Sequence, residues 1–154
     1  MKDPFPLPRI ENLLARIGNA SFFSTLDLHS GYRQIPMKKS DTYKAAFVIT
    51  NGKYEYTVMR FGLVNAPSIF ARYMAGLFRS LLFVCVYLDD ILIFSNPKEE
   101  HWRYIEQVLQ ILQQEKLVAK DKMCHFATHA VEFLGYLIGH NKMTPSIMKC
   151  LAFI

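Results

Sequence analysis

Two adjacent aspartates, Asp89 and Asp90, interrupt an otherwise apolar run at residues 81–94. Adjacent carboxylates repel each other and each resists removal from water, so such a pair is costly in an apolar segment. A tight turn between two buried strands, opening on a cleft, lowers this cost, and a divalent cation lowers it further. Carboxylate oxygens are the ligands that Mg²⁺ prefers, and two such ions support in-line phosphoryl transfer. The alternative is an ordinary hairpin turn that contains two acids.

A third aspartate has a similar setting. Residues 21–28 are predicted to form a strand, whose alternation places Phe23, Thr25 and Asp27 on one face. An acid at the end of this strand, beside an Asp-Asp turn, would gather three carboxylates around one pair of metal ions. The alternative role for Asp27 is to cap the turn that follows it, as aspartate often does.

The tetrapeptide Tyr-Leu-Asp-Asp at 87–90 is one of seven blocks that follow one another along nearly the whole chain. The others are Phe-Pro-Leu-Pro-Arg-Ile at 5–10, Leu-Asp-Leu-His-Ser-Gly-Tyr-Arg-Gln-Ile at 26–35, Lys-Ala-Ala-Phe at 44–47, Tyr-Glu-Tyr-Thr-Val at 54–58, Phe-Gly-Leu-Val-Asn-Ala-Pro-Ser at 61–68 and Val-Glu-Phe-Leu-Gly at 131–135. In this order the blocks resemble the reverse transcriptases of gypsy-type LTR retrotransposons.

The resemblance implies an RNA-directed DNA polymerase domain of a retrotransposon polyprotein, which transfers a nucleotide from a dNTP to the 3′-hydroxyl of a primer. It implies that Asp27, Asp89 and Asp90 are the catalytic and metal-binding residues. The first two would chelate two Mg²⁺ ions, with Mn²⁺ as an alternative, and the third would tune the pair. The implied partners are an RNA or DNA template with its primer, dNTPs, and the remaining polyprotein domains, including the thumb and ribonuclease H.

The resemblance also implies a set of nucleotide-binding residues: Leu28, Tyr32, Phe61 and Gly62. In the family, a bulky side chain at the position of Tyr32 lies under the incoming sugar and collides with a 2′-hydroxyl, which selects deoxynucleotides. From the residues alone, Tyr32 is an aromatic in a turn, a kind of residue that is commonly part-buried in a core. Gly62 is, on the same basis, a loop glycine that permits close backbone approach.

Two further assignments rest on the resemblance. The primer grip, which holds the primer 3′ end, would comprise Phe133, Leu134, Gly135 and Tyr136. An amphipathic hairpin explains the periodicity of this segment equally well. Lys122 is the candidate for protonating the leaving pyrophosphate, and its alternative is a solvated charge at a helix end.

Cysteine and histidine residues provide little sign of a metal or disulfide framework. The three cysteines are scattered and form no Cys-x-x-Cys, which favours a reducing compartment. Cys124, His125 and His129 offer three ligands where a structural zinc site takes four, so zinc is not expected. The apolar run at 81–94 is too short for a membrane span and is broken by two acids. We expect an intracellular protein of the cytoplasm or nucleus, within a virus-like particle when the element is intact.

The order of predicted elements indicates an α+β fold, an antiparallel sheet backed by helices on one face. These elements are a helix at 10–17, the strand at 21–28, a hairpin at 44–59 turning at Asn51-Gly52, a helix from Pro67 to Leu81, the Asp-Asp hairpin, a helix at 99–116 burying Trp102, Ile105, Leu109 and Leu112, and a hairpin at 131–143 turning near His140-Asn141. With 154 residues the chain is one domain, 1–154. The resemblance makes it a polymerase palm with part of the fingers, without thumb, connection or ribonuclease H.

The charge distribution agrees with a polyanionic partner. The formal net charge is +5, and residues 1–77 carry ten Lys and Arg against five acids while residues 78–154 carry eight of each. A second hypothesis is an RNA-binding module built on a sheet with exposed aromatics, but the chain lacks the aromatic signature of such a central strand. A third hypothesis is a truncated, inactive copy that retains only weak nucleic-acid binding.

Overall fold

The computed structural model describes residues 5–140 and 142–146. The helices are α1 (Ile10–Ile17), α2 (Ala66–Leu77) and α3 (Lys98–Gln114). The strands are β1 (Phe22–Asp27), β2 (Ala46–Ile49), β3 (Gly52–Glu55), β4 (Val84–Tyr87), β5 (Asp90–Ser95), β6 (His125–Thr128), β7 (Ala130–Phe133), β8 (Tyr136–Gly139) and β9 (Lys142–Pro145). Short 3₁₀ helices occupy Gly31–Gln34, Lys39–Ala45 and Asp121–Met123. The predicted α+β class and antiparallel sheets are confirmed.

The centre of the fold is an antiparallel sheet of four strands in the order β4-β5-β1-β6. The two middle strands are matched along their whole length, from Phe22 opposite Ser95 to Asp27 opposite Asp90. Residues directly opposite each other on antiparallel strands present their side chains on the same face. The register therefore fixes which face each acid occupies.

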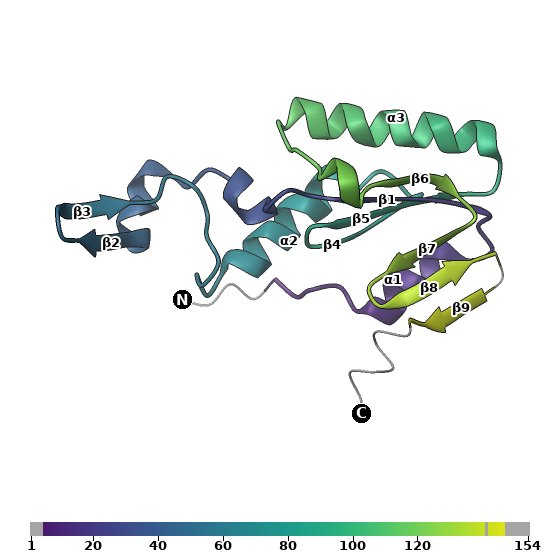
Figure 1. Cartoon of the computed structure of the whole chain (residues 1–154), viewed down its shortest axis with the longest axis horizontal. Coiled ribbons are helices and arrows are strands. Elements are labelled where there is room, and N and C mark those ends of the chain that lie inside the picture. Colours follow the sequence, from purple (N-terminus) through teal and green to yellow (C-terminus); the bar gives the residue numbers. More distant parts are fainter. Residues whose placement is uncertain (1–4, 141, 147–154) are drawn as a thin grey trace.

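Both faces of this sheet are covered, whereas the sequence predicted helices on one face. On one side α2 and α3 pack on β1 and β5 through residues such as Phe70, Val108 and Ile93. On the other side α1 and the β7-β8-β9 sheet pack against the alternate residues, including Phe23 and Leu92. Figure 1 shows α3 along one side of the sheet and the β7-β8-β9 sheet beside α1. Because every residue from Ile91 to Phe94 is apolar, β5 can be buried on both faces, and a one-sided pattern does not apply.

The buried stripe of α3 differs from the predicted one. Trp102 and Leu109 are 51% and 42% exposed, and His101 and Val108 are fully buried in their place, together with Ile105 and Leu112. His101 replaces an apolar residue because both ring nitrogens are hydrogen-bonded, Nε2 to Ser24 Oγ at 2.8 Å and Nδ1 to Ser95 Oγ at 2.9 Å. A buried polar group with its partners in place carries little penalty, and hydropathy alone cannot anticipate such partners.

The C-terminal segment forms two successive hairpins where the sequence predicted one. β7 pairs with β8 across a turn at Leu134 and Gly135, both of which have positive φ (53° and 75°). Positive φ at both central residues is the geometry that suits a two-residue hairpin turn. The predicted turn near His140-Asn141 falls between β8 and β9, and Asn141 itself lies outside the described residues.

The β2–β3 hairpin extends away from the body of the molecule (Figure 1). Its strands pair from Ala46 opposite Glu55 to Ile49 opposite Gly52, so the turn is at Thr50 and Asn51, one residue before the predicted place. Gly52 has φ of +144°, a conformation that favours glycine, and it follows the turn rather than forming part of it. In the described part of the chain, no helix is long and apolar enough to cross a membrane.

Candidate active site

Three acids lie where β1 ends and the β4–β5 hairpin turns. Asp27 is the last residue of β1 and lies directly opposite Asp90, the first residue of β5. Tyr87 pairs with Asp90, which leaves Leu88 and Asp89 as a two-residue turn, with Leu88 at φ +51°. The backbone N–H of Leu28 donates to the carbonyl of Asp89 at 3.0 Å and ties this turn to the end of β1. Strand register and turn together therefore bring the predicted acids to one edge of the sheet.

The carboxylate of Asp89 is packed against the backbone of the segment that follows β1. Its Oδ1 is buried and has no hydrogen-bond partner among the described residues. A side chain at Gly31 would collide with this Oδ1, and its Cβ would lie 2.7 Å from Cζ of Phe70. The absence of a side chain at Gly31 is what leaves room for Asp89. A buried oxygen without a partner is costly unless a cation or water satisfies it.

The electrostatics of the site favour a cation. Burial raises the pKa of Asp89 and the charge of Asp27 raises it further, whereas the charge of Lys120 and a hydrogen bond from the backbone N–H of Gly31 to the carboxylate lower it. Desolvation, followed by the charges of Asp27 and Asp89, raises the pKa of Asp90, and again Lys120 lowers it. The carboxylates of Asp27 and Asp89 thus repel a charge on Asp90, which is exposed as a residue. Repulsion of this kind is what a bound divalent ion removes.

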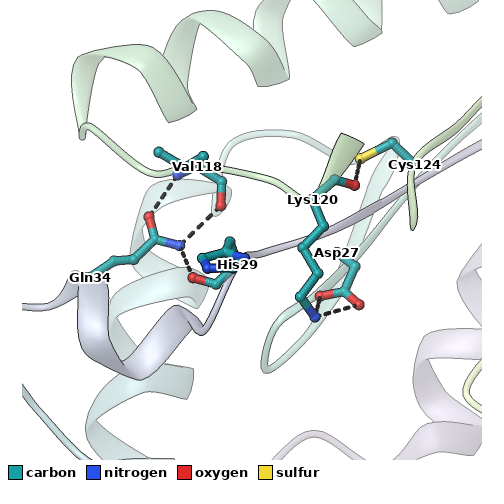
Figure 2. A network of polar contacts seen from close by, with 6 residues as sticks. All are labelled: Asp27, His29, Gln34, Val118, Lys120 and Cys124. Atoms are coloured by element: carbon teal, nitrogen blue, oxygen red, sulfur yellow. Dashed lines mark hydrogen bonds and ion pairs between the residues drawn. The ribbon is translucent and has the colours of Figure 1, made fainter. Parts of the chain in front are cut away.

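In this structure a lysine provides the counter-charge. Nζ of Lys120 lies 3.0 Å from Oδ1 and 3.2 Å from Oδ2 of Asp27, a contact that Figure 2 marks with dashed lines. The side chains are 40% and 20% exposed, respectively. The backbone reinforces the pair, because the N–H of Lys120 donates to the carbonyl of Asp27 at 2.7 Å. Lys120 therefore occupies one side of the acid cluster.

Gln34 holds the segment that carries this lysine. Its Nε2 donates to the carbonyls of His29 (2.7 Å) and Val118 (2.9 Å), and its Oε1 accepts from the N–H of Val118 (2.6 Å). Figure 2 shows the amide lying between the chain after β1 and the chain before Lys120. The N–H of His29 also donates to the carbonyl of Val118 at 2.8 Å. These bonds fix two segments that are far apart in the sequence beside the acids.

The acids are the right donors for Mg²⁺ but are not assembled around one point. Among residues 5–140 and 142–146, no group of three or more His, Cys, Asp or Glu side chains is close enough to hold a metal ion. Hard carboxylate oxygens and the unpartnered Oδ1 of Asp89 fit such an ion chemically. The ammonium of Lys120 already neutralises part of the negative charge at Asp27.

The residues predicted to bind nucleotide fall into two groups. Tyr32 is buried between aromatic rings, with centroid distances of 4.7 Å to Phe61 and 5.0 Å to Phe70. Phe61 is 65% exposed, and Gly62 beside it has φ of +93°. The side chain of Leu28 is fully buried, and its backbone N–H donates to the carbonyl of Asp89, so the side chain and the N–H both stabilise the fold. Desolvation, then the charge of Asp89, raises the pKa of Tyr32.

The segment predicted to be the primer grip is the β7–β8 turn. Phe133 is buried, Leu134 and Gly135 form the turn, and Tyr136 begins β8. Leu134 and Tyr136 pack on the same core cluster as Tyr87, the residue directly before the turn at Leu88 and Asp89. The turn therefore lies on the face of the sheet to which Asp27 and Asp90 also belong.

Lys122, the predicted proton donor, is exposed in a short 3₁₀ helix and forms no ion pair within the described residues. The lysine that reaches the acids is Lys120. No sequence pattern assigned a role to Lys120, and none assigned a role to Gly31 and Gln34. Both of these lie inside the block at 26–35, yet their partners, Asp89 and Val118, are more than fifty residues away. No local pattern signals such pairings.

Comparison with known proteins agrees with this geometry. The family described as reverse transcriptase (RNA-dependent DNA polymerase) matches residues 1–138. The chain belongs to the reverse transcriptase family. Over 138 residues it is 46% identical to a retrovirus-related Pol polyprotein from transposon opus of Drosophila melanogaster, and over 153 residues it is 38% identical to that from transposon gypsy. These alignments cover 88% and 97% of this chain but only 14% and 15% of the relatives.

Solved structures share the fold. A foamy viral protease-reverse transcriptase in complex with an RNA/DNA hybrid superposes with a TM-score of 0.88 at 22% identity, covering 96% of this chain and 20% of that one. The native prototype foamy virus protease-reverse transcriptase gives a TM-score of 0.77 at 28% identity, covering 87% of this chain and 18% of that one. The resemblance drawn from the seven sequence blocks is confirmed at the level of family and fold.

Proposed function

We propose that this chain is the catalytic core of an RNA-directed DNA polymerase in a retrotransposon polyprotein, comprising the palm and part of the fingers. The observation that carries the proposal is the position of Asp27, Asp89 and Asp90 at one edge of the sheet, where Oδ1 of Asp89 is buried and has no hydrogen-bond partner among residues 5–140 and 142–146. An ordinary hairpin turn is not stabilised by a second acid, Asp90, placed next to Asp89 and opposite Asp27. A site that binds divalent cations, in contrast, needs the negative charge that these three carboxylates supply.

The acids would hold two Mg²⁺ ions, or Mn²⁺ in their place. When bound, the ions supply activation of the primer 3′-hydroxyl and neutralisation of the triphosphate. The chain itself contributes position: the matched register of β1 and β5 orients Asp27 and Asp90, and the space at Gly31 admits Asp89. Fixed placement of reacting groups is a large part of what such a protein adds to the chemistry.

The substrates follow from the surroundings of the acids. We infer that the exposed ring of Phe61 and the backbone at Gly62 meet the nucleotide, and that buried Tyr32, packed on Phe61, limits the space beside the sugar. The β7–β8 turn at Leu134 and Gly135 would hold the primer end from the same face of the sheet. The template and primer are RNA or DNA, and the other polyprotein domains complete the enzyme inside the cell, in the cytoplasm or nucleus.

The direct test is primer extension by the parent polyprotein with dNTPs, Mg²⁺ and an RNA template. Asp89→Asn removes the charge and keeps the shape, so we expect at least ~10³-fold slower extension with an unchanged fold by circular dichroism. Asp121→Asn is the matched control, because Asp121 is an exposed acid in a 3₁₀ helix, and it should extend normally. Near-normal extension by the Asp89 variant would show that this acid is only a turn residue.

A further inference from the structure

We propose that Lys120 is a removable counter-ion: its ammonium holds Asp27 while the site has no metal, and a divalent cation must displace it in order to bind. This inference rests on the proposed function, because it concerns the same acids. It adds a positioning residue whose effect is on the affinity and order of metal binding rather than on the reacting atoms.

The contact has the geometry of a direct competitor. Nζ of Lys120 is within 3.2 Å of both carboxylate oxygens of Asp27, so it occupies both of the atoms that a metal would use. Asp27 lies opposite Asp90, and the charge of Lys120 acts on both Asp89 and Asp90. One ammonium therefore offsets a cluster of three carboxylates. An ammonium and a divalent cation beside the same carboxylate repel each other, so a lysine that stays at Asp27 weakens the binding of the metal.

The backbone fixes where the lysine starts but leaves its ammonium free to move. The N–H of Lys120 donates to the Asp27 carbonyl, and an isolated bridge pairs Leu28 with Ala119. Gln34 anchors the preceding residue, Val118, by two further hydrogen bonds. The side chain itself is 40% exposed, so its four-carbon stem can swing the charge into water without disturbing the fold.

This arrangement explains why the acids are not gathered around one point. While Lys120 neutralises Asp27, the carboxylates of Asp89 and Asp90 gain nothing by approaching it, and Oδ1 of Asp89 stays buried with no hydrogen-bond partner in the described part of the chain. When a doubly charged ion displaces the ammonium, approach of the three carboxylates becomes favourable, because two positive charges offset the repulsion among all three acids.

The test measures Mn²⁺ binding to the purified chain in the absence of nucleic acid and dNTPs, by the loss of the free-ion electron paramagnetic resonance signal. Lys120→Met keeps the apolar stem and removes the charge, and we expect it to bind Mn²⁺ about fivefold more tightly, the scale of one ion pair. Lys122→Met is the matched control, because Lys122 is exposed and lies two residues after Lys120, so this variant removes the same charge from a nearby position. Its affinity for Mn²⁺ should stay within about twofold of that of the wild type.

Equal affinities for the two lysine variants would overturn the inference, and so would weaker binding by Lys120→Met. Asp27→Asn should weaken binding severalfold, and unchanged binding by that variant would place the metal elsewhere and also reject the idea. If Lys120→Met does not fold, Lys120→Gln, which can still hydrogen-bond, replaces it. A metal-dependent rise in melting temperature that is larger for the Lys120 variant than for the wild type provides a second readout.

The result separates this inference from the proposed function. Tighter Mn²⁺ binding by Lys120→Met, together with no primer extension by the parent polyprotein, would leave the counter-ion standing and reject the polymerase. Normal primer extension that depends on Asp89, together with identical Mn²⁺ affinities for Lys120→Met and Lys122→Met, would keep the polymerase and reject the counter-ion.

Discussion

Two hairpins of equal length in this chain have opposite surroundings. β4–β5 and β2–β3 each pair over four residue positions, and each closes with a two-residue turn. Ile91, Leu92 and Ile93 of β5 are fully buried, whereas every residue of β3 is exposed and Val48 of β2 is 76% exposed. The candidate chemistry is at the turn of the buried hairpin. Local strand pairing is therefore enough to form a hairpin, but burial on both faces is what holds a side chain in one place.

The exposed hairpin is held by a different kind of contact. The ring of Phe47 stacks on Tyr54 and Tyr56, with centroids 5.9 and 4.6 Å apart, and the guanidinium of Arg60 lies 3.9 Å from the centroid of Tyr56. Aromatic pairs and cation–π contacts contribute on the order of 1 kcal/mol each. Such contacts are enough to favour one arrangement, but they allow the hairpin to open independently of the central sheet.

The largest expected effect contrasts isoleucines of the two hairpins. Ile93→Ala in β5 removes a fully buried side chain and leaves a cavity, so it should lower the free energy of unfolding by about 2–5 kcal/mol. Ile49→Ala, at a residue 50% exposed in β2, should cost no more than about 0.5 kcal/mol. Urea unfolding followed by circular dichroism measures both. Similar costs for the two variants would abolish the contrast.

A glycine pair sharpens the contrast at the site itself. Gly31→Ala would force Cβ into Oδ1 of Asp89 and toward Phe70, so we expect a loss of about 1–3 kcal/mol in unfolding free energy. Gly76→Ala, on the exposed side of α2 with no atom within 4 Å, should instead stabilise the chain by about 0.5–1 kcal/mol. Thermal melts of the two variants compare them. A harmless Gly31→Ala would mean that Asp89 is not tightly placed.

The buried polar contact behind β5 predicts a pH dependence that the exposed hairpin lacks. A neutral His101 protonated at Nδ1 satisfies its neighbours: Ser24 Oγ accepts from the N–H of Ala127 and donates to Nε2, and Ser95 Oγ accepts from Nδ1 and donates to the carbonyl of Pro97. Desolvation lowers the pKa of His101 from its ordinary value of 6.5. Between the lowered and the ordinary value the unfolded chain binds more protons than the folded one.

The stabilisation from His101 is therefore complete above pH 6.5 and is lost as the pH falls through its folded-state pKa. Urea midpoints measured from pH 7.5 downward should fall in the wild type and fall less in His101→Gln, which cannot titrate. His29→Gln removes an exposed histidine and should keep the wild-type slope. Identical slopes for the wild type and His101→Gln would reject this role for His101.

The smallest expected effect is confined to the exposed hairpin. Phe47→Ala removes the centre of the ring stack, so amide hydrogen exchange in residues 46–55 should accelerate while amides of β1 and β5 keep their rates. Global stability should change by less than about 1 kcal/mol. Val48→Ala, on the neighbouring exposed position, should leave all of these rates unchanged. Faster exchange in β1 after Phe47→Ala would mean that the two regions open together.

The elements of the fold were predictable because each carries a local signal. The helix at Ile10–Ile17 followed from its apolar spacing, and the Asp-Asp hairpin followed from two acids inside an apolar run. The prediction of which face of α3 is buried was wrong, because the hydrogen-bond partners that make His101 acceptable inside the core, Ser24 and Ser95, come from two other elements. A hydropathy pattern records the residue and not its partners.

The candidate site was predictable only in part for the same reason. Asp27, Asp89 and Asp90 stand out because charge is costly next to apolar strands. Lys120 does not, because its partner Asp27 is 93 residues away and lysines are usually solvated. The turn at Leu134 and Gly135 was missed because leucine rarely adopts positive φ, so nothing in the sequence marks it as a turn.

The most direct measurement is a crystal structure of the parent polymerase with primer, template, dNTP and Mn²⁺, in which anomalous scattering locates the metal. The predicted result is manganese in contact with Asp27 and Asp89 at the turn of the buried hairpin, with the ammonium of Lys120 withdrawn from Asp27. Manganese bound away from these acids, with the ion pair between Lys120 and Asp27 intact, would contradict the assignment of this edge of the sheet as the active site.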